Sequence, residues 1–172
     1  MSRNLVGIYG DSVYRIQMII SLEQLGIVRE KHINVIIGFC SGVYDLLHKG
    51  HINVIQQAKQ SCDVLVVAVN DDWYVENVKG TTPVMNQDSR IQAVDSLPFV
   101  DYCCFLSTKD RAHIFENLKP DIIILPDNHE TSLEDLRARG IRVKIVPYTK
   151  GISTTILKKL LAIITDNENI KQ

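Results

Sequence analysis

Short apolar runs alternate along the chain with stretches whose apolar residues recur at helical spacing. From residue 33 onward, five runs have the length and composition of buried strands, at 33–39, 64–69, 102–106, 121–125 and 142–146. Such runs are typical of strands covered on both faces of a parallel sheet. Helical patterns lie at 51–60, 87–96, 112–118, 132–139 and 153–165. This alternation predicts an α/β fold, a doubly wound five-stranded parallel sheet.

The first 32 residues fit the alternation less well. Residues 5–9 read as a strand, and Asp11 or Ser12 could cap a helix that buries Ile20 and Ile27. We therefore expect an N-terminal extension over 1–32, packed on the core or on a second subunit, and one domain over 33–172. Alternatively, the extension is the remnant of a larger fused protein.

The composition excludes several classes of protein. The chain has 172 residues, and its 19 Lys and Arg nearly cancel its 20 Asp and Glu. This balance argues against a nucleic-acid partner and against a polybasic membrane anchor. The longest apolar runs are far shorter than the roughly 20 residues of a membrane helix. The four cysteines lack the spacing of a disulfide framework, which predicts a cytoplasmic location.

One segment carries the chemistry. Residues 38–51 leave the first buried strand and open a helix, and ligands of doubly wound sheets bind beyond such strand ends. His48 and His51 flank Gly50 at the predicted start of the helix, where backbone N–H groups and the helix dipole attract anions. Gly50 lets a phosphate approach the backbone. The two imidazoles supply further donors as charge builds on a phosphate.

Residues 42–51, Gly-Val-Tyr-Asp-Leu-Leu-His-Lys-Gly-His, resemble the HxGH motif of the cytidylyltransferase-like nucleotidyltransferases. The likeness is strongest to the glycerol-3-phosphate and phosphoethanolamine cytidylyltransferases. The nucleotidyl domain of the bacterial heptose-phosphate adenylyltransferases is similar too. A second segment, Gly-Ile-Ser-Thr-Thr at 151–155, resembles the one with which the family holds the nucleotide's β and γ phosphates. The resemblance covers about residues 33–161.

The resemblance implies a reaction and its partners. We expect transfer of CMP from CTP to a small phosphorylated acceptor, such as a polyol or amino-alcohol phosphate, with release of pyrophosphate. Mg²⁺ would accompany the nucleotide, with no metal site built from protein side chains alone. One alternative is adenylyl transfer from ATP to a heptose phosphate or a cofactor precursor. Another is a nucleotide-binding module without catalysis. Relatives are commonly dimers, so a homodimer is expected.

The resemblance also assigns roles to residues. His48, His51 and Lys79 would be catalytic, because they reach the reacting phosphates. The nucleotide would lie against Ser41, Gly42, Val43, Tyr44, Asp45, Gly50, Arg90, Asp127, Lys150, Gly151, Ile152, Ser153, Thr154 and Thr155. Lys109, Arg111 and Asn128 are the expected contacts of the acceptor.

Two positions depart from the family pattern. Tyr148 stands where the cytidylyltransferases usually carry an arginine, and Lys150 is a candidate source of the missing charge. Pro126 replaces the family's glycine before Asp127, so a backbone donor near the base is absent. This second departure weakens the assignment of cytosine as the base.

Overall fold

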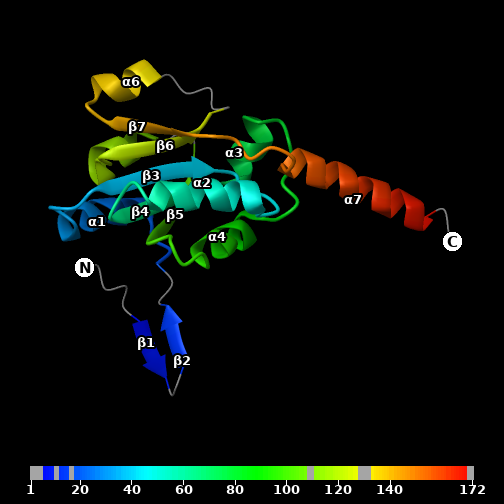
Figure 1. Ribbon diagram of the computed structural model, residues 1–172, viewed down its shortest axis with the longest axis horizontal. Helices are drawn as coiled ribbons and strands as arrows, with labels where there is room; N and C mark the ends of the chain where they lie inside the picture. Colours follow the sequence, from blue (N-terminus) through cyan, green and yellow to red (C-terminus); the bar gives the residue numbers. More distant parts are fainter. Residues whose placement is uncertain (1–5, 10–11, 16–17, 108–110, 128–132, 170–172) are drawn as a thin grey trace.

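The computed structural model (Figure 1) describes residues 6–9, 12–15, 18–107, 111–127 and 133–169. The strands are β1 (Val6–Tyr9), β2 (Ser12–Arg15), β3 (Ile37–Gly42), β4 (Val64–Asn70), β5 (Tyr102–Leu106), β6 (Ile122–Pro126) and β7 (Arg142–Val146). The helices are η1 (Leu22–Gln24), α1 (Leu25–Lys31), α2 (Lys49–Lys59), α3 (Asp72–Asn77), α4 (Gln87–Asp95), α5 (Arg111–His113), η3 (Ile114–Leu118), α6 (Leu133–Ala138) and α7 (Thr154–Asn169).

Five strands form one parallel sheet in the order β5-β4-β3-β6-β7. The predicted doubly wound α/β fold is thus confirmed. The chain winds from β3 outward to β5, then returns to the other side of β3 with β6 and β7. The strand order reverses between β3 and β6, and in open sheets of this kind the ligand crevice lies beyond the carboxyl ends at that point.

The neighbouring strands β3 and β6 are paired only near the start of each strand. β3 pairs with β4 over its whole length, but its register with β6 covers only Gly38 and Phe39, opposite Ile122 and Ile123. Beyond Phe39 the backbones of β3 and β6 are no longer paired, which leaves room for side chains and ligands between their carboxyl ends.

The core has one layer on each face of the sheet. One layer contains residues of α1, η3 and α6, and the other contains residues of α2 and α4. Consecutive residues of β4 alternate between these layers, with Val66 in the first layer and Val67 in the second. Cys104 and Cys103 divide in the same way, as expected for neighbours in a strand.

The predicted strand at 33–39 begins later than expected. β3 starts at Ile37, and residues 32–34 form a turn after α1. Ile33 is 70% exposed, so it is outside the core despite its apolar character. The strand instead gains residues at its carboxyl end, because β4 pairs with it as far as Gly42. The other four predicted strands lie within a residue of their predicted bounds.

The helix predicted to begin at Asp11 or Ser12 is wrong. Ser12–Arg15 is strand β2, which pairs antiparallel with β1, and the helix of this region is α1. Ile27, expected to be buried, is 61% exposed, whereas Leu25 and Val28 lie in the core. Residues from Met18 to Lys31 therefore share the core of the sheet rather than standing apart from it.

Two further elements differ from the sequence pattern. The predicted helix at 112–118 is a short α-helix followed by the π-helix η3, and α3 was not predicted as an element. Helix α7 extends away from the body of the molecule (Figure 1). Its apolar residues Ile156, Leu160 and Ile164 are between 42% and 55% exposed. None of the helices in the described ranges is long and apolar enough to span a membrane.

Candidate active site

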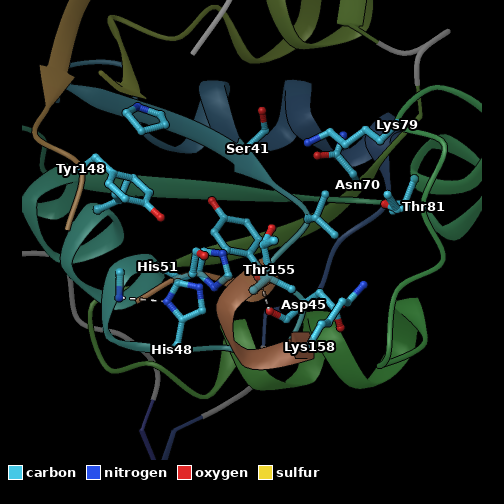
Figure 2. Close-up of a pocket in the computed structure, with 18 of the residues that line it drawn as sticks. Ser41, Asp45, His48, His51, Asn70, Lys79, Thr81, Tyr148, Thr155 and Lys158 are labelled. Atoms are coloured by element: carbon cyan, nitrogen blue, oxygen red, sulfur yellow. Dashed lines mark hydrogen bonds and ion pairs between the residues drawn. The ribbon is translucent and has the colours of Figure 1, made fainter. Parts of the chain in front are cut away.

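A cavity of about 860 Å³ opens at the carboxyl ends of β3, β4 and β6, beside the start of α7. Figure 2 shows most of its lining. Loops after β3 and β4 form its floor and one wall, and the segment between β7 and α7 forms another. The lining runs from Ser41 to Lys159, a span of more than 100 positions, and the sheet topology brings its parts together.

His48 is the N-cap of α2, and Gly50 makes its conformation possible. The Gly50 N–H donates to His48 Nδ1 at 3.0 Å. A Cβ at position 50 would lie 2.8 Å from His48 Cε1, so only glycine allows the ring to lie against the helix start. In the neutral ring the proton is then on Nε2, which leaves His48 an N–H donor for a ligand. Burial lowers the pKa of His48, which favours this neutral form.

His51 lies one turn further along α2 and packs on His48. The two imidazoles are stacked, with ring centroids 3.9 Å apart and planes at 21°. Burial, with a smaller contribution from His48, lowers the pKa of His51 to about 4. Its Nδ1 is buried and makes no hydrogen bond to the described residues. Both lowered pKa values favour the neutral rings at pH 7, in which each imidazole carries one N–H donor and no charge.

Asp45 joins three parts of the site. Its carboxylate is almost fully buried and accepts hydrogen bonds from the backbone N–H groups of Val84 and Met85 at 3.0–3.1 Å. Lys158 of α7 forms an ion pair with the same carboxylate at 3.0 Å. These hydrogen bonds and the ion pair outweigh burial and lower the pKa of Asp45. The carboxylate holds the loop before α4 and the start of α7 against the HxGH segment.

The start of α7 faces the cavity. The Ser153 hydroxyl accepts from the Ile156 N–H at 3.2 Å, and the Thr154 hydroxyl donates to the Asp45 carbonyl at 3.0 Å. Lys158 and Lys159, one turn further on, also line the cavity. This terminus therefore combines a helix dipole with two ammonium groups, an arrangement suited to a polyanion.

Arg90 supports the cavity from behind. Its side chain is completely buried and donates to the carbonyl oxygens of Val43, Asn70 and Met85. The guanidinium also pairs with Asp72 at 2.7 Å. One arginine thus fixes the loops that follow β3 and β4, which identifies it as a positioning residue.

The two ends of the cavity differ in character. Tyr148 lies at one end, whereas Asn70, Lys79 and Thr81 lie at the other (Figure 2). The Tyr148 ring is 40% exposed, and its hydroxyl donates to the Ile152 carbonyl at 3.2 Å. The first end offers flat apolar surface, and the second offers an ammonium group with amide and hydroxyl groups.

A family model described as cytidylyltransferase-like matches residues 39–160, which include the cavity and most of the sheet. The chain belongs to the cytidylyltransferase-like family. The chain is 35% identical over 126 residues to the "Bifunctional protein HldE" of Hyphomonas neptunium, covering 70% of this chain and 26% of that relative. A protein of the same name from Campylobacter fetus is 34% identical over 145 residues, covering 83% and 31%. The chain spans between a quarter and a third of the length of these two relatives.

Solved structures of relatives support the same family. The lipopolysaccharide core biosynthesis protein from Thermoplasma volcanium is similar with a TM-score of 0.60 and 32% identity, covering 69% of this chain and all of that one. The pantoate-beta-alanine ligase from Francisella tularensis has a TM-score of 0.59 at 19% identity, covering 78% of this chain and 68% of that one, which shows a shared fold alone.

The structure brings together most of the residues that the cytidylyltransferase-like motifs predicted. The predicted residues that line the cavity are Ser41, Val43, Tyr44, Asp45, His48, Gly50, His51, Lys79, Ser153, Thr154 and Thr155. The predicted residues outside its lining are Gly42, Arg90, Asp127, Lys150, Gly151 and Ile152. Asp127 accepts from the Tyr148 N–H at 3.1 Å, so it orients a lining residue. Lys150 is exposed beside the cavity.

The residues expected to contact the acceptor are Lys109, Arg111 and Asn128. Lys109 and Asn128 lie outside the described residues, and only the backbone of Arg111 is described. The lining includes residues that the sequence did not assign to the site: Val54, Asn70, Val75, Thr81, Thr82, Thr149, Lys158 and Lys159. Asn70 could have been found, because it is the polar residue that ends a buried strand. Lys158 and Lys159 follow Thr154 and Thr155 by four residues each, which places them on the face of α7 that carries those two threonines.

Among the described residues, no group of three or more His, Cys, Asp and Glu side chains could hold a metal ion. The Asp45 carboxylate, which lies beside the histidines, already has three protein partners, the N–H groups of Val84 and Met85 and the Lys158 ammonium. Mg²⁺ usually retains several waters and binds through substrate phosphates. A phosphorylated ligand that carried Mg²⁺ would hold the ion mainly through its own phosphate oxygens.

Proposed function

We propose that this protein transfers AMP from ATP to a phosphorylated sugar of the heptose class and releases pyrophosphate. The observation that carries the proposal is the stacked His48–His51 pair at the start of α2, facing a cavity that also holds three lysines. Membership of the cytidylyltransferase-like family supports nucleotidyl transfer. Relatives named HldE, and a structural relative from lipopolysaccharide core biosynthesis, favour the adenylyl reaction on a heptose phosphate over CMP transfer.

The reaction needs no general base. The acceptor phosphate is already an anion, and one of its oxygens attacks the α-phosphorus of the nucleotide. The new P–O bond forms as the bond between the α-phosphorus and the bridging oxygen breaks, and that oxygen leaves with the pyrophosphate. Catalysis then consists of positioning and of stabilising charge on the transferred group.

The neutral histidines fit this role. His48 and His51 donate hydrogen bonds to the oxygens on the α-phosphorus, and these bonds strengthen as negative charge accumulates there. The start of α7 with Ser153 and Lys158 receives the departing pyrophosphate. The apolar end of the cavity at Tyr148 accepts the base, which leaves the end with Lys79 for the phosphate of the acceptor.

CMP transfer from CTP is the second candidate. The Gly-Ile-Ser-Thr-Thr segment at 151–155, which resembles that of the cytidylyltransferases, favours it. The base is the part of the nucleotide that differs between the two reactions. A direct comparison of ATP with CTP, each offered with heptose phosphates and with glycerol 3-phosphate, separates the candidates.

The test measures pyrophosphate release with each pair of substrates. We expect release with ATP and a heptose phosphate, and a loss of about 10²–10³-fold in turnover for His51→Asn, the size expected for one lost electrostatic donor. His113→Asn, at an exposed histidine far from the cavity, is the matched control and keeps its turnover. Release with CTP alone would favour the second candidate. Tight nucleotide binding without release for any acceptor would refute both.

A further inference from the structure

We propose that Tyr44 is a positioning residue whose buried ring fixes the orientation of the His51 imidazole toward the reacting phosphate. This inference rests on the proposed function, because His51 must act on a phosphate for its orientation to affect turnover. It begins with an unusual backbone. Tyr44 has a φ of 56° and Leu46 a φ of 49°, both in the left-handed region.

A bulky residue in the left-handed region is a rare and unfavourable conformation that persists only where the surroundings enforce it. Strand β3 ends at Gly42 and the turn that follows covers Asp45 and Leu46, so Tyr44 lies between the strand and the turn. The strained φ turns the aromatic side chain inward, beneath the loop, where it is 4% exposed. A residue without a function there would be expected to be Gly or Asn.

The ring is enclosed on three sides. A Cβ at Gly42 would lie 3.0 Å from Tyr44 Cζ, so glycine at that position makes room for the ring. Below, the Tyr44 hydroxyl donates to Cys40 Sγ at 3.7 Å, and both side chains are buried. The third side is the His51 ring, with centroids 5.4 Å apart and planes at 75°, an edge-on aromatic contact.

His51 is consequently held between two rings, with Tyr44 edge-on to it and His48 stacked on it. The dry environment that these rings create agrees with the lowered pKa of His51, whose main cause is burial. The titratable groups that act on His51 are His48, which lowers the pKa, and Asp45, which raises it. Neither the position of His48 nor that of Asp45 depends on a hydrogen bond from Tyr44, so replacing Tyr44 isolates the effect of its ring.

The experiment compares three variants of the full chain by NMR titration of the histidines and by steady-state kinetics. Tyr44→Leu removes the ring, and Tyr44→Phe keeps it while removing the hydroxyl. Tyr102→Leu is the matched control: Tyr102 is a buried tyrosine in an edge-on contact with His32, with centroids 5.8 Å apart, on a strand distant from the cavity.

Tyr44→Leu should raise the pKa of His51 by at least one unit, since water then reaches the imidazole. It should lower kcat about 10²-fold, as misplacement by roughly 1 Å does, while each KM changes by less than about threefold. Tyr44→Phe keeps the ring, so it should leave the His51 titration unchanged and retain a kcat well above that of Tyr44→Leu. Tyr102→Leu should leave both the His51 titration and kcat close to those of the unaltered protein.

An unaltered His51 titration and kcat in folded Tyr44→Leu would overturn the proposal, as would equal losses in Tyr44→Phe. If Tyr44→Leu does not fold, Tyr44→Met replaces it, because the flexible thioether side chain fills irregular space. The titration needs no substrate. It therefore tests the position of His51 even if the proposed transfer reaction is absent, so the two failures can be told apart.

Discussion

His51 connects the stability of the protein to pH. In the unfolded chain a histidine titrates near 6.5, whereas burial lowers the pKa of His51 to about 4 in the folded protein. Between these two values the unfolded state binds more protons than the folded state, so the free energy of unfolding falls as the pH falls. The stabilisation is fully present above pH 6.5 and is lost on the way down to pH 4.

We predict that His51→Asn loses less stability than the unaltered protein between pH 7 and pH 4. The lowering of the His51 pKa corresponds to a difference of about 3 kcal/mol between the two proteins in the free energy of unfolding that is lost. Urea unfolding at several pH values measures it. His48 and His32 also have lowered pKa values, but they are present in both proteins and cancel in the comparison. Parallel pH profiles for the two proteins would contradict the prediction.

The residue types at the site could be predicted from the sequence because the HxGH segment is contiguous. His48, Gly50 and His51 lie within four positions of one another, so their proximity is guaranteed by one helix turn. The contact of Tyr44 with Cys40 could not be predicted, because it depends on a left-handed φ that no local pattern at position 44 indicates.

At the scale of elements, Arg90 fastens α4 to the ends of two strands. Its guanidinium is fully buried and bonded to three backbone carbonyl oxygens and to Asp72. Removing the guanidinium would leave the three carbonyl oxygens and the Asp72 carboxylate without this hydrogen-bond donor. The sequence places Arg90 in a helix and the family resemblance assigns it to the nucleotide. Its bonds to the backbone carbonyls after β3 and at the end of β4 could not be predicted, because they require the fold.

Arg90→Met should destabilise the protein by about 3–5 kcal/mol, the range for breaking a buried ion pair from one side. Chemical denaturation measures the loss. Arg137→Met, at an exposed arginine of α6, is the control and should change stability by less than about 0.5 kcal/mol. Equal stabilities of the two variants would show that the Arg90 hydrogen bonds are replaced by water.

Element boundaries were predictable where charged or turn residues flank the apolar run, whether or not the strand is central in the sheet. The bounds predicted for 102–106 and 142–146 agree with β5 and β7, because charge or turn residues flank both apolar runs. The strand predicted at 33–39 begins too early, because Ile33 lies in a turn and its apolar side chain is exposed. Apolar character alone does not distinguish a strand from the loop before it.

On the scale of the whole molecule, the most unusual surface is α7. Its residues Ile156, Leu160, Leu161, Ile163 and Ile164 are all more than 40% exposed, although their spacing is that of a buried face. The helix leaves the sheet after its first turns, so the domain does not cover them. The homodimer that the family resemblance predicts stays a prediction, which sedimentation velocity would test.

We predict that Leu160→Gln changes the free energy of unfolding of the isolated chain by less than about 0.5 kcal/mol, since an exposed side chain loses little on becoming polar. Leu65→Ala, at a fully buried residue of β4, is the matched comparison and should lose about 2–5 kcal/mol. Thermal denaturation at low protein concentration measures both. A loss at Leu160 as large as that at Leu65 would contradict the exposure of this face.

The route of the chain before α1 also bears on aggregation. Cys103, on the edge strand β5, donates to the Met18 carbonyl at 3.0 Å and accepts from the Ile20 N–H at 2.8 Å. Ile19 forms a parallel bridge with the same residue. An uncovered edge strand is a template for pairing with other chains, and natural proteins block it with covering segments or with charge. The opposite edge, β7, carries Arg142 and Lys144. One edge of the sheet is thus covered by the chain itself, whereas the other carries charge at the exposed Arg142. The Lys144 ammonium is instead bonded to the Gln57 carbonyl and the Ser61 hydroxyl at the end of α2.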